Sequence, residues 1–200
     1  MSGPGTARSA PAPPSVSDVL DIRLREVTDA DVLVFFAHQQ DDDAYWMAAF
    51  APRRDRDAFI THWDRIRTDK TGQTKTILVD GQVAGSMLQW IDVDSGKPEV
   101  GYWIGREYWG RGVATHALST FLEEVEQRPV YAHVAADNVG SRRVLEKCGF
   151  TVVGEAETLS AARGEDVREL ILELRGTADH REATSGTAGT RADPAARRPE

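Results

Sequence analysis

Two glycines flank an arginine at Gly110-Arg111-Gly112, between a strand-like stretch at 99–104 and an apolar-striped stretch from 113 to 125. This junction constrains the fold more than any other part of the chain. Glycine tolerates positive φ and has no Cβ, so a ligand can approach its backbone closely, and the first N–H groups of a helix have no partner within it. The helix dipole and Arg111 add positive charge. The junction is therefore expected to bind a diphosphate.

Two well-known phosphate-binding loops do not match this stretch. A Walker loop requires Gly-x4-Gly-Lys-Ser/Thr, which the chain lacks, and a Rossmann turn requires a third glycine where this chain has Thr115. An ordinary tight turn from strand to helix remains the simplest alternative. The residues that follow the junction decide between a diphosphate-binding site and an ordinary turn.

A second motif follows the first at a fixed distance. Asn138-x-x-Ser141 opens a further helix-like stretch, which ends at Gly149-Phe150. Together the two motifs resemble the GNAT acyl-CoA N-acyltransferases, and the wording of 102–112 is similar to the branch that contains the ribosomal-protein N-terminal acetyltransferases. The resemblance covers about 21–175. It implies an α/β fold, in which a mixed, mainly antiparallel sheet carries helices on both faces, and acetyl transfer from acetyl-CoA to a primary amine in a ternary complex.

The resemblance also implies where acetyl-CoA would bind. The diphosphate would meet backbone amides from Gly110 to Thr115. The pantetheine would run beside the fourth expected strand, at 99–104, where that strand separates from the fifth, at 130–135. The expected cofactor contacts are Trp103, Ile104, Trp109, Gly110, Arg111, Gly112, Val113, Ala114, Thr115, Asn138 and Arg143. Trp109 departs from many family members, which have Gln or Arg at its position. Pure helix capping by Asn138 and exposed helix charge at Arg143 are the alternatives.

Glu99, at the start of the fourth strand, lies where the family often places a general base. An α-ammonium has a pKa of about 8 and a lysine ammonium one of about 10, so the acceptor must lose a proton before it attacks a thioester. His116 and His133 are alternative bases. A solvated strand end is the non-catalytic interpretation of Glu99.

Ser141 lies where members of this branch have a serine near the CoA sulfur. Many other members place a tyrosine four residues later to protonate the thiolate, and here that residue is Leu145. The proton donor to the departing thiolate is therefore Ser141, a water or no group at all. Helix capping is the alternative role of Ser141. An acyl-enzyme on Cys148 is disfavoured, because the family transfers directly and a small buried residue is common before a helix-ending glycine.

Length and composition indicate one domain. The chain has 200 residues, 40% of them hydrophobic, and a single cysteine, which excludes an internal disulfide framework. We expect a disordered leader at 1–17, a GNAT domain at 18–175 and a disordered tail at 176–200. No signal peptide or membrane span is recognisable, so the expected location is the cytoplasm and no membrane partner is expected.

The net charge of −8 argues against nucleic-acid binding and favours small cationic amines as ligands. Asp41, Asp42 and Asp43 could collect such a substrate, with Tyr45, Trp46 and Phe50 as pocket walls, although a solvated loop also explains the aspartates. No His, Cys and Asp cluster has metal-ligand spacing, so no metal is expected. The acceptor stays open between a protein N-terminus and a small molecule, and a binding-only module is a further alternative. The oligomeric state stays open between monomer and homodimer.

The other elements follow from hydrophobic periodicity and turn residues. Asp80-Gly81 predicts a tight hairpin turn. The fifth strand should lie parallel to the fourth, because a helix connects them. The expected elements are a strand at 21–25, helices at 29–38 and 55–69 around a loop or broken helix at 39–54, hairpin strands at 76–79 and 83–93, a fifth strand at 130–135, a helix from Asn138 to Gly149, and closing strands at 150–155 and 167–174.

Overall fold

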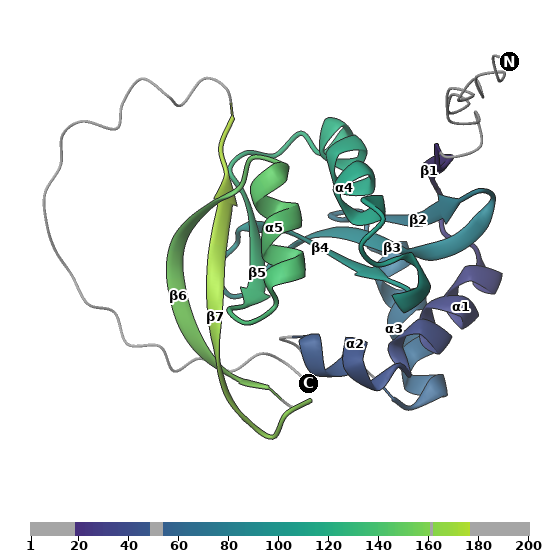
Figure 1. Ribbon diagram of the computed structural model, residues 1–200, viewed down its shortest axis with the longest axis horizontal. Helices are drawn as coiled ribbons and strands as arrows, with labels where there is room; N and C mark the ends of the chain where they lie inside the picture. The colour runs from purple at the N-terminus through teal and green to yellow at the C-terminus, as the bar shows by residue number, and fades with distance from the viewer. Residues whose placement is uncertain (1–18, 49–53, 161, 177–200) are drawn as a thin grey trace, which may run out of the picture.

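The structure is a computed structural model that describes residues 19–48, 54–160 and 162–176 (Figure 1). The expected leader at 1–17 lies outside these residues, as do Phe50 and, apart from Gly176, the expected tail. The elements are β1 (Ile22–Arg25), α1 (Asp29–Gln39), α2 (Asp42–Met47), α3 (Arg56–Thr68), β2 (Gln73–Val79), β3 (Gln82–Ile91), β4 (Pro98–Ile104), the 3₁₀ turn η2 (Arg106–Tyr108), α4 (Val113–Glu124), β5 (Val130–Ala135), α5 (Val139–Lys147), β6 (Thr151–Ser160) and β7 (Glu165–Leu174).

The strands form one mixed sheet in the order β1-β2-β3-β4-β5-β7-β6. Every neighbouring pair is antiparallel except β4 and β5, which are parallel. The connection between these two strands runs through α4, which is why they can be parallel. The expected α/β fold with a mainly antiparallel sheet is confirmed.

Helices cover both faces of the sheet, and each face has its own core (Figure 1). On one face, Leu118 and Phe121 of α4 and Leu145 of α5 pack with strand residues such as Met87. On the other face, Phe35 of α1 lies against Trp63 of α3, with their ring centroids 4.8 Å apart. Full burial of such a side chain stabilises a fold by roughly 1.5–3 kcal/mol, so both layers hold the sheet in place.

Local backbone signals in the sequence match the observed turns. Asp80 and Gly81 have φ values of 51° and 78°, as a primed hairpin turn requires. The Asn138 side chain accepts a bond from Ser141 N at 3.0 Å, and Gly149 follows α5 with a φ of 91°. The capped start and the left-handed end of α5 are therefore confirmed.

The closing strands are longer than the sequence predicts. β6 continues to Ser160 and β7 begins at Glu165, and the two pair along this whole length. Ladder hydrogen bonds hold these outer residues, although they include the charged Glu157, Glu165 and Asp166 and show no apolar alternation. The expected broken helix at 39–54 contains the short α2, whose first turn is capped by Asp41.

The parallel pair β4 and β5 opens along its length. Only Glu99 and Tyr131, near the start of each strand, form a ladder pair between them. The rest of β4, toward Ile104, therefore runs without a strand partner on its β5 side in the described part of the chain, and Figure 1 shows the two strands diverging. This gap is the feature of the fold that positions the site.

Candidate active site

The N-terminus of α4 forms a cradle of unpaired backbone amides. Gly110 and Gly112 have φ values of 72° and 80°, and Gly112 is the N-cap residue of α4. The amide of His116 makes the first helical bond, to Gly112 O at 3.1 Å, so the three N–H groups before it have no partner within the helix. A Cβ built on either glycine would meet nothing within 4 Å, so open space lies beside this backbone. The arrangement suits a diphosphate.

Other residues of the loop have different roles. The indole Nε1 of Trp109 donates to Ile104 O at 2.9 Å, which ties the loop to the end of β4. The Arg111 guanidinium lies 5.9 Å from the Tyr108 ring centroid on an exposed part of the loop, so its charge is available. The Val113 side chain is buried, and only its backbone can meet a ligand.

Of Trp103 and Ile104, only Ile104 turns its backbone toward the gap. The bond from Gly105 N to Ala84 O continues the ladder with β3 and makes Trp103 and Ser86 a hydrogen-bonded pair, so the backbone of Trp103 faces β3. The Trp103 side chain packs under α2 against Ala44 and Ala48, and that of Ile104 lies in the core beneath α4. Neither side chain is free to contact a cofactor. Backbone amides along a free strand edge can still pair with an extended amide chain, which is the chemistry of pantetheine.

Asn138 and Ser141 lie at the start of α5. Besides capping α5 through Oδ1, Asn138 donates from Nδ2 to the carbonyl of Met47 at 3.1 Å, which connects α5 to the end of α2. Ser141 Oγ lies 2.8 Å from the hydroxyl of Tyr102 on β4. Sequence reasoning missed Tyr102, although strand alternation places residues 100, 102 and 104 on the same face of β4. Arg143 is exposed on α5.

Glu99 belongs to a partly buried chain of titratable groups. Its Oε1 lies 3.4 Å from Nε2 of His133, and Nδ1 of His133 lies 3.2 Å from Oε2 of Glu169. Thr158 also donates to this Glu169 oxygen, at 3.2 Å. The carboxylates of Glu169 and Glu99 raise the pKa of His133 to about 9, against the opposing effect of burial. His133 is therefore an imidazolium at neutral pH, so it is not available as a general base.

Glu99 and Ser141 lie on opposite sides of the sheet. Val100 and Tyr102 pack with the core beneath α4 and α5, whereas Trp103 faces α2. Since successive side chains of a strand alternate, Glu99 shares the face of Trp103. The carboxylate thus lies on one face of the sheet, at the paired end of β4 and β5, and the Ser141 hydroxyl lies on the other face, beside Tyr102.

Two other candidate residues are not part of this arrangement. His116 is exposed on α4, beside the apolar stripe. Cys148 donates from Sγ to Thr115 O at 3.5 Å, and burial raises the pKa of its thiol. A thiol that resists ionisation is a poor nucleophile, which agrees with the expectation against an acyl-enzyme.

The aspartates before and within α2 are already occupied. Arg106 of η2 pairs with Asp41 at 3.4 Å and with Asp43, and Arg54 pairs with Asp42 at 2.8 Å. The pairs with Arg106 connect α2 to the loop that follows β4. The run is thus part of the structure that covers Trp103, which weakens its interpretation as a collector of cationic substrate.

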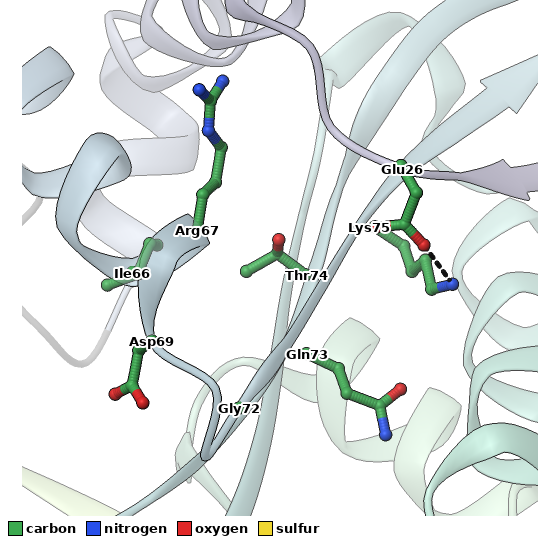
Figure 2. A pocket seen from close by; sticks show the side chains of 8 residues that line it. All are labelled: Glu26, Ile66, Arg67, Asp69, Gly72, Gln73, Thr74 and Lys75. Carbon is green, nitrogen blue, oxygen red and sulfur yellow. Dashed lines mark hydrogen bonds and ion pairs between the residues drawn. The ribbon is translucent and has the colours of Figure 1, made fainter.

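A separate hollow of about 180 Å³ lies between the end of α3 and the start of β2 (Figure 2). Its wall carries Arg67, Asp69 and the pair formed by Lys75 and Glu26, at 2.7 Å. Opposite charges balance there, and none of the expected site residues lines it. Within residues 19–48, 54–160 and 162–176, no three His, Cys, Asp or Glu side chains are grouped to hold a metal, and no helix is long and apolar enough to cross a membrane.

A parallel strand pair that opens toward a glycine-bounded helix N-terminus defines the class of acyl-CoA N-acyltransferases. Residues 21–151 match the family model described as acetyltransferase (GNAT) domain, and the chain belongs to this family. It is therefore an acetyl-transferring enzyme that uses acetyl-CoA as co-substrate and an amine as acceptor.

Known relatives agree with this assignment. The chain is 32% identical over 151 residues to the "Putative ribosomal N-acetyltransferase YdaF" of Bacillus subtilis, across 70% of this chain and 82% of the relative. A solved "Probable acetyltransferase" is 27% identical, with a TM-score of 0.62, over 77% of this chain and 92% of the other. Spermidine N-acetyltransferase from Vibrio cholerae, solved with CoA and spermine, is 18% identical, with a TM-score of 0.64, over 76% and 95%.

Proposed function

We propose that the protein acetylates the α-amino group of a protein N-terminus by direct attack on acetyl-CoA in a ternary complex. The observation that carries this proposal is the placement of Glu99 and Ser141 on opposite faces of the sheet, with Glu99 at the end of the gap where β4 and β5 are paired. An amine that enters from the Glu99 side would meet the thioester in the gap, with Ser141 beyond it. The name of the relative in Bacillus subtilis favours a ribosomal protein as acceptor.

The cofactor would lie along two backbone segments. The amides from Gly110 to Thr115, with the charge of Arg111, would hold the diphosphate at the α4 N-terminus. The free edge of β4 at Ile104 would hold the pantetheine amides. Trp109 contributes by fixing the loop to Ile104 O, and Asn138 by fixing the start of α5. Arg143, exposed on α5, would reach toward the adenosine phosphate.

Glu99 would remove the proton of the acceptor ammonium. Its neighbour His133 is already protonated at neutral pH, because its pKa is raised to about 9, and so it cannot accept a further proton. The imidazolium instead fixes the Glu99 carboxylate at 3.4 Å. General base catalysis of this kind contributes roughly 10²–10⁴-fold to rate.

Ser141 would stabilise the departing sulfur. It lies in the first turn of α5, and no tyrosine stands at position 145 to supply a proton. A free thiol has a pKa of about 8.5, so a hydroxyl that donates a hydrogen bond to the thiolate is enough at neutral pH.

A small cationic amine is the second candidate acceptor. Glu99, Glu169 and the His133 imidazolium together carry one net negative charge, which attracts an ammonium of any size. The sheet face that carries them belongs to a fold shared with spermidine N-acetyltransferase. The pairing of Asp41, Asp42 and Asp43 with arginines removes the further negative charges that a polyamine would use.

A direct screen decides between these acceptors. Acetyl-CoA is offered with peptides that copy ribosomal-protein N-termini, with spermine and with aminoglycosides, and thiol release and product mass are followed. We expect acetylation of peptide α-amines and none of peptides blocked at the N-terminus. Acetylation of spermine alone would assign the small-molecule function. The free thiol of Cys148 fits a reducing compartment, so the cytoplasm is the proposed location.

A further inference from the structure

We propose that Tyr102 is a positioning residue that directs the hydroxyl proton of Ser141 toward the sulfur of CoA. This inference rests on the proposed place of Ser141 beside the thioester. Tyr102 comes from β4 and Ser141 from α5, so their contact fixes the two sides of the gap relative to each other.

The phenol hydroxyl of Tyr102 faces two oxygens of Ser141. It lies 2.8 Å from Ser141 Oγ, a contact in which either oxygen can donate, and 3.3 Å from Ser141 O, which can only accept. In the proposed arrangement the phenolic proton is directed at Oγ, the nearer of the two oxygens. When Oγ accepts from Tyr102, the proton of the serine hydroxyl points away from the tyrosine. It is then free for a ligand in the gap.

Burial keeps Tyr102 in its donor form. The ring packs against the core beneath α4 and α5, and this desolvation raises the pKa of the phenol well above its usual range. The titratable neighbour on α5 is Cys148, whose own pKa is raised by burial. Arg142 and Glu146 pair with each other on the exposed side of α5, and His116 is exposed on α4. No charge that would ionise the phenol therefore reaches it among the described residues.

The chemistry needs no proton transfer from Tyr102. When the C–S bond of the tetrahedral adduct breaks, the electron pair moves to sulfur, and the Ser141 hydroxyl donates a hydrogen bond to the thiolate. The amine proton taken up by Glu99 returns to solvent, and the released thiolate takes a proton from solvent. Tyr102 only orients the Ser141 hydroxyl, and a donor that already points at the sulfur lowers the free energy of the charged leaving group.

The test reads the acidity of CoA itself and needs no acceptor. The ultraviolet absorption of the thiolate is titrated for CoA bound to a Cys148→Ala protein, in which the only cysteine of the chain is absent. A hydrogen bond to the charged form favours ionisation, so bound CoA should be more acidic than free CoA by about tenfold. Tyr102→Phe should remove most of that gain.

Two comparisons separate positioning from other roles. Ser141→Ala should remove the same gain, and the double variant should be no worse than Ser141→Ala, since Tyr102 acts through Ser141. Tyr131→Phe, which removes a hydroxyl on the opposite face of the sheet, should leave the titration unchanged. Desulfo-CoA, which lacks the sulfur, should bind equally to all of these proteins.

Three outcomes would overturn the proposal. The first is an unchanged titration in Tyr102→Phe, and the second is additive losses in the double variant. The third involves Tyr102→fluorotyrosine, which keeps every packing contact but makes the phenol a stronger donor, so that bound CoA should become more acidic still. Weaker binding of desulfo-CoA to Tyr102→Phe, together with no such increase in the fluorotyrosine protein, would show that Tyr102 acts on binding alone. Failure to acetylate any amine would concern the proposed function alone, because the titration uses only CoA.

Discussion

Nε2 of His133 lies 3.4 Å from Oε1 of Glu99, and the other ring nitrogen of this histidine contacts Glu169. The carboxylate with the expected basic role is thus held by a cation that two carboxylates keep protonated. Its side chain is only 15% exposed, so bulk water reaches it poorly and an entering ammonium would be its principal new partner.

Glu99→Gln should lower turnover by about 10²–10⁴-fold near neutral pH and leave the affinity for acetyl-CoA unchanged. The amide cannot take the amine proton, whereas the diphosphate cradle lies at the other end of β4. Raising the pH should restore part of the rate, since solvent then deprotonates the amine. Steady-state rates across pH check this. A rate within a few-fold of the unmodified protein at every pH would show that Glu99 is not the base.

His133 should make stability depend on pH. Its folded pKa of about 9 lies above the reference value of 6.5, so the protonated form is favoured by folding. The contribution is complete below about pH 6.5 and is lost as the pH rises through about 9. The free energy of unfolding in urea, measured for the natural protein and for His133→Gln, should therefore differ most near pH 6. A difference that grows above pH 9 would contradict the assigned protonation.

Gly112→Val should abolish the rise in melting temperature that acetyl-CoA produces. At a φ of 80°, valine is strained, and its side chain would fill the space that the diphosphate needs. Gly81→Val is the matched control, because Gly81 has a φ of 78° and equally open surroundings in the β2–β3 turn. Both variants should lose stability alone, and Gly81→Val should keep the cofactor-induced shift. Equal shifts in both would remove the cradle from the cofactor site.

Asn138→Asp should loosen α2 and leave α5 intact. The carboxylate can still cap α5, but it cannot donate to Met47 O as Nδ2 does. Loss of one such hydrogen bond is typically worth about 0.5–1.5 kcal/mol. Hydrogen exchange should therefore quicken in α2 and stay slow in α5, whereas Asn138→Ala should quicken both. Equal changes in α5 for the two variants would show that the aspartate does not preserve the cap.

Features set by neighbouring residues were predicted from the sequence. Gly110, Gly112 and Gly149 occupy left-handed backbone that glycine adopts without strain, and Asn138 caps α5 through the residue three positions later. Hydrophobic periodicity likewise predicted the order of strands and helices, and the helix that connects β4 to β5 predicted that these two strands are parallel. These features depend on local backbone chemistry, which a short stretch of sequence contains.

The contacts that would organise catalysis depended on tertiary structure. Tyr102 meets Ser141 across 39 residues of sequence, and Asn138 reaches Met47 across 91. The sequence named Glu99 and His133 as separate candidate bases, and only the register of β4 against β5, with Glu99 opposite Tyr131, brought them together. Strand adjacency and side-chain direction arise from packing of the whole sheet, so the sequence determined which groups were present, and the fold decided which of them meet and which one stays protonated.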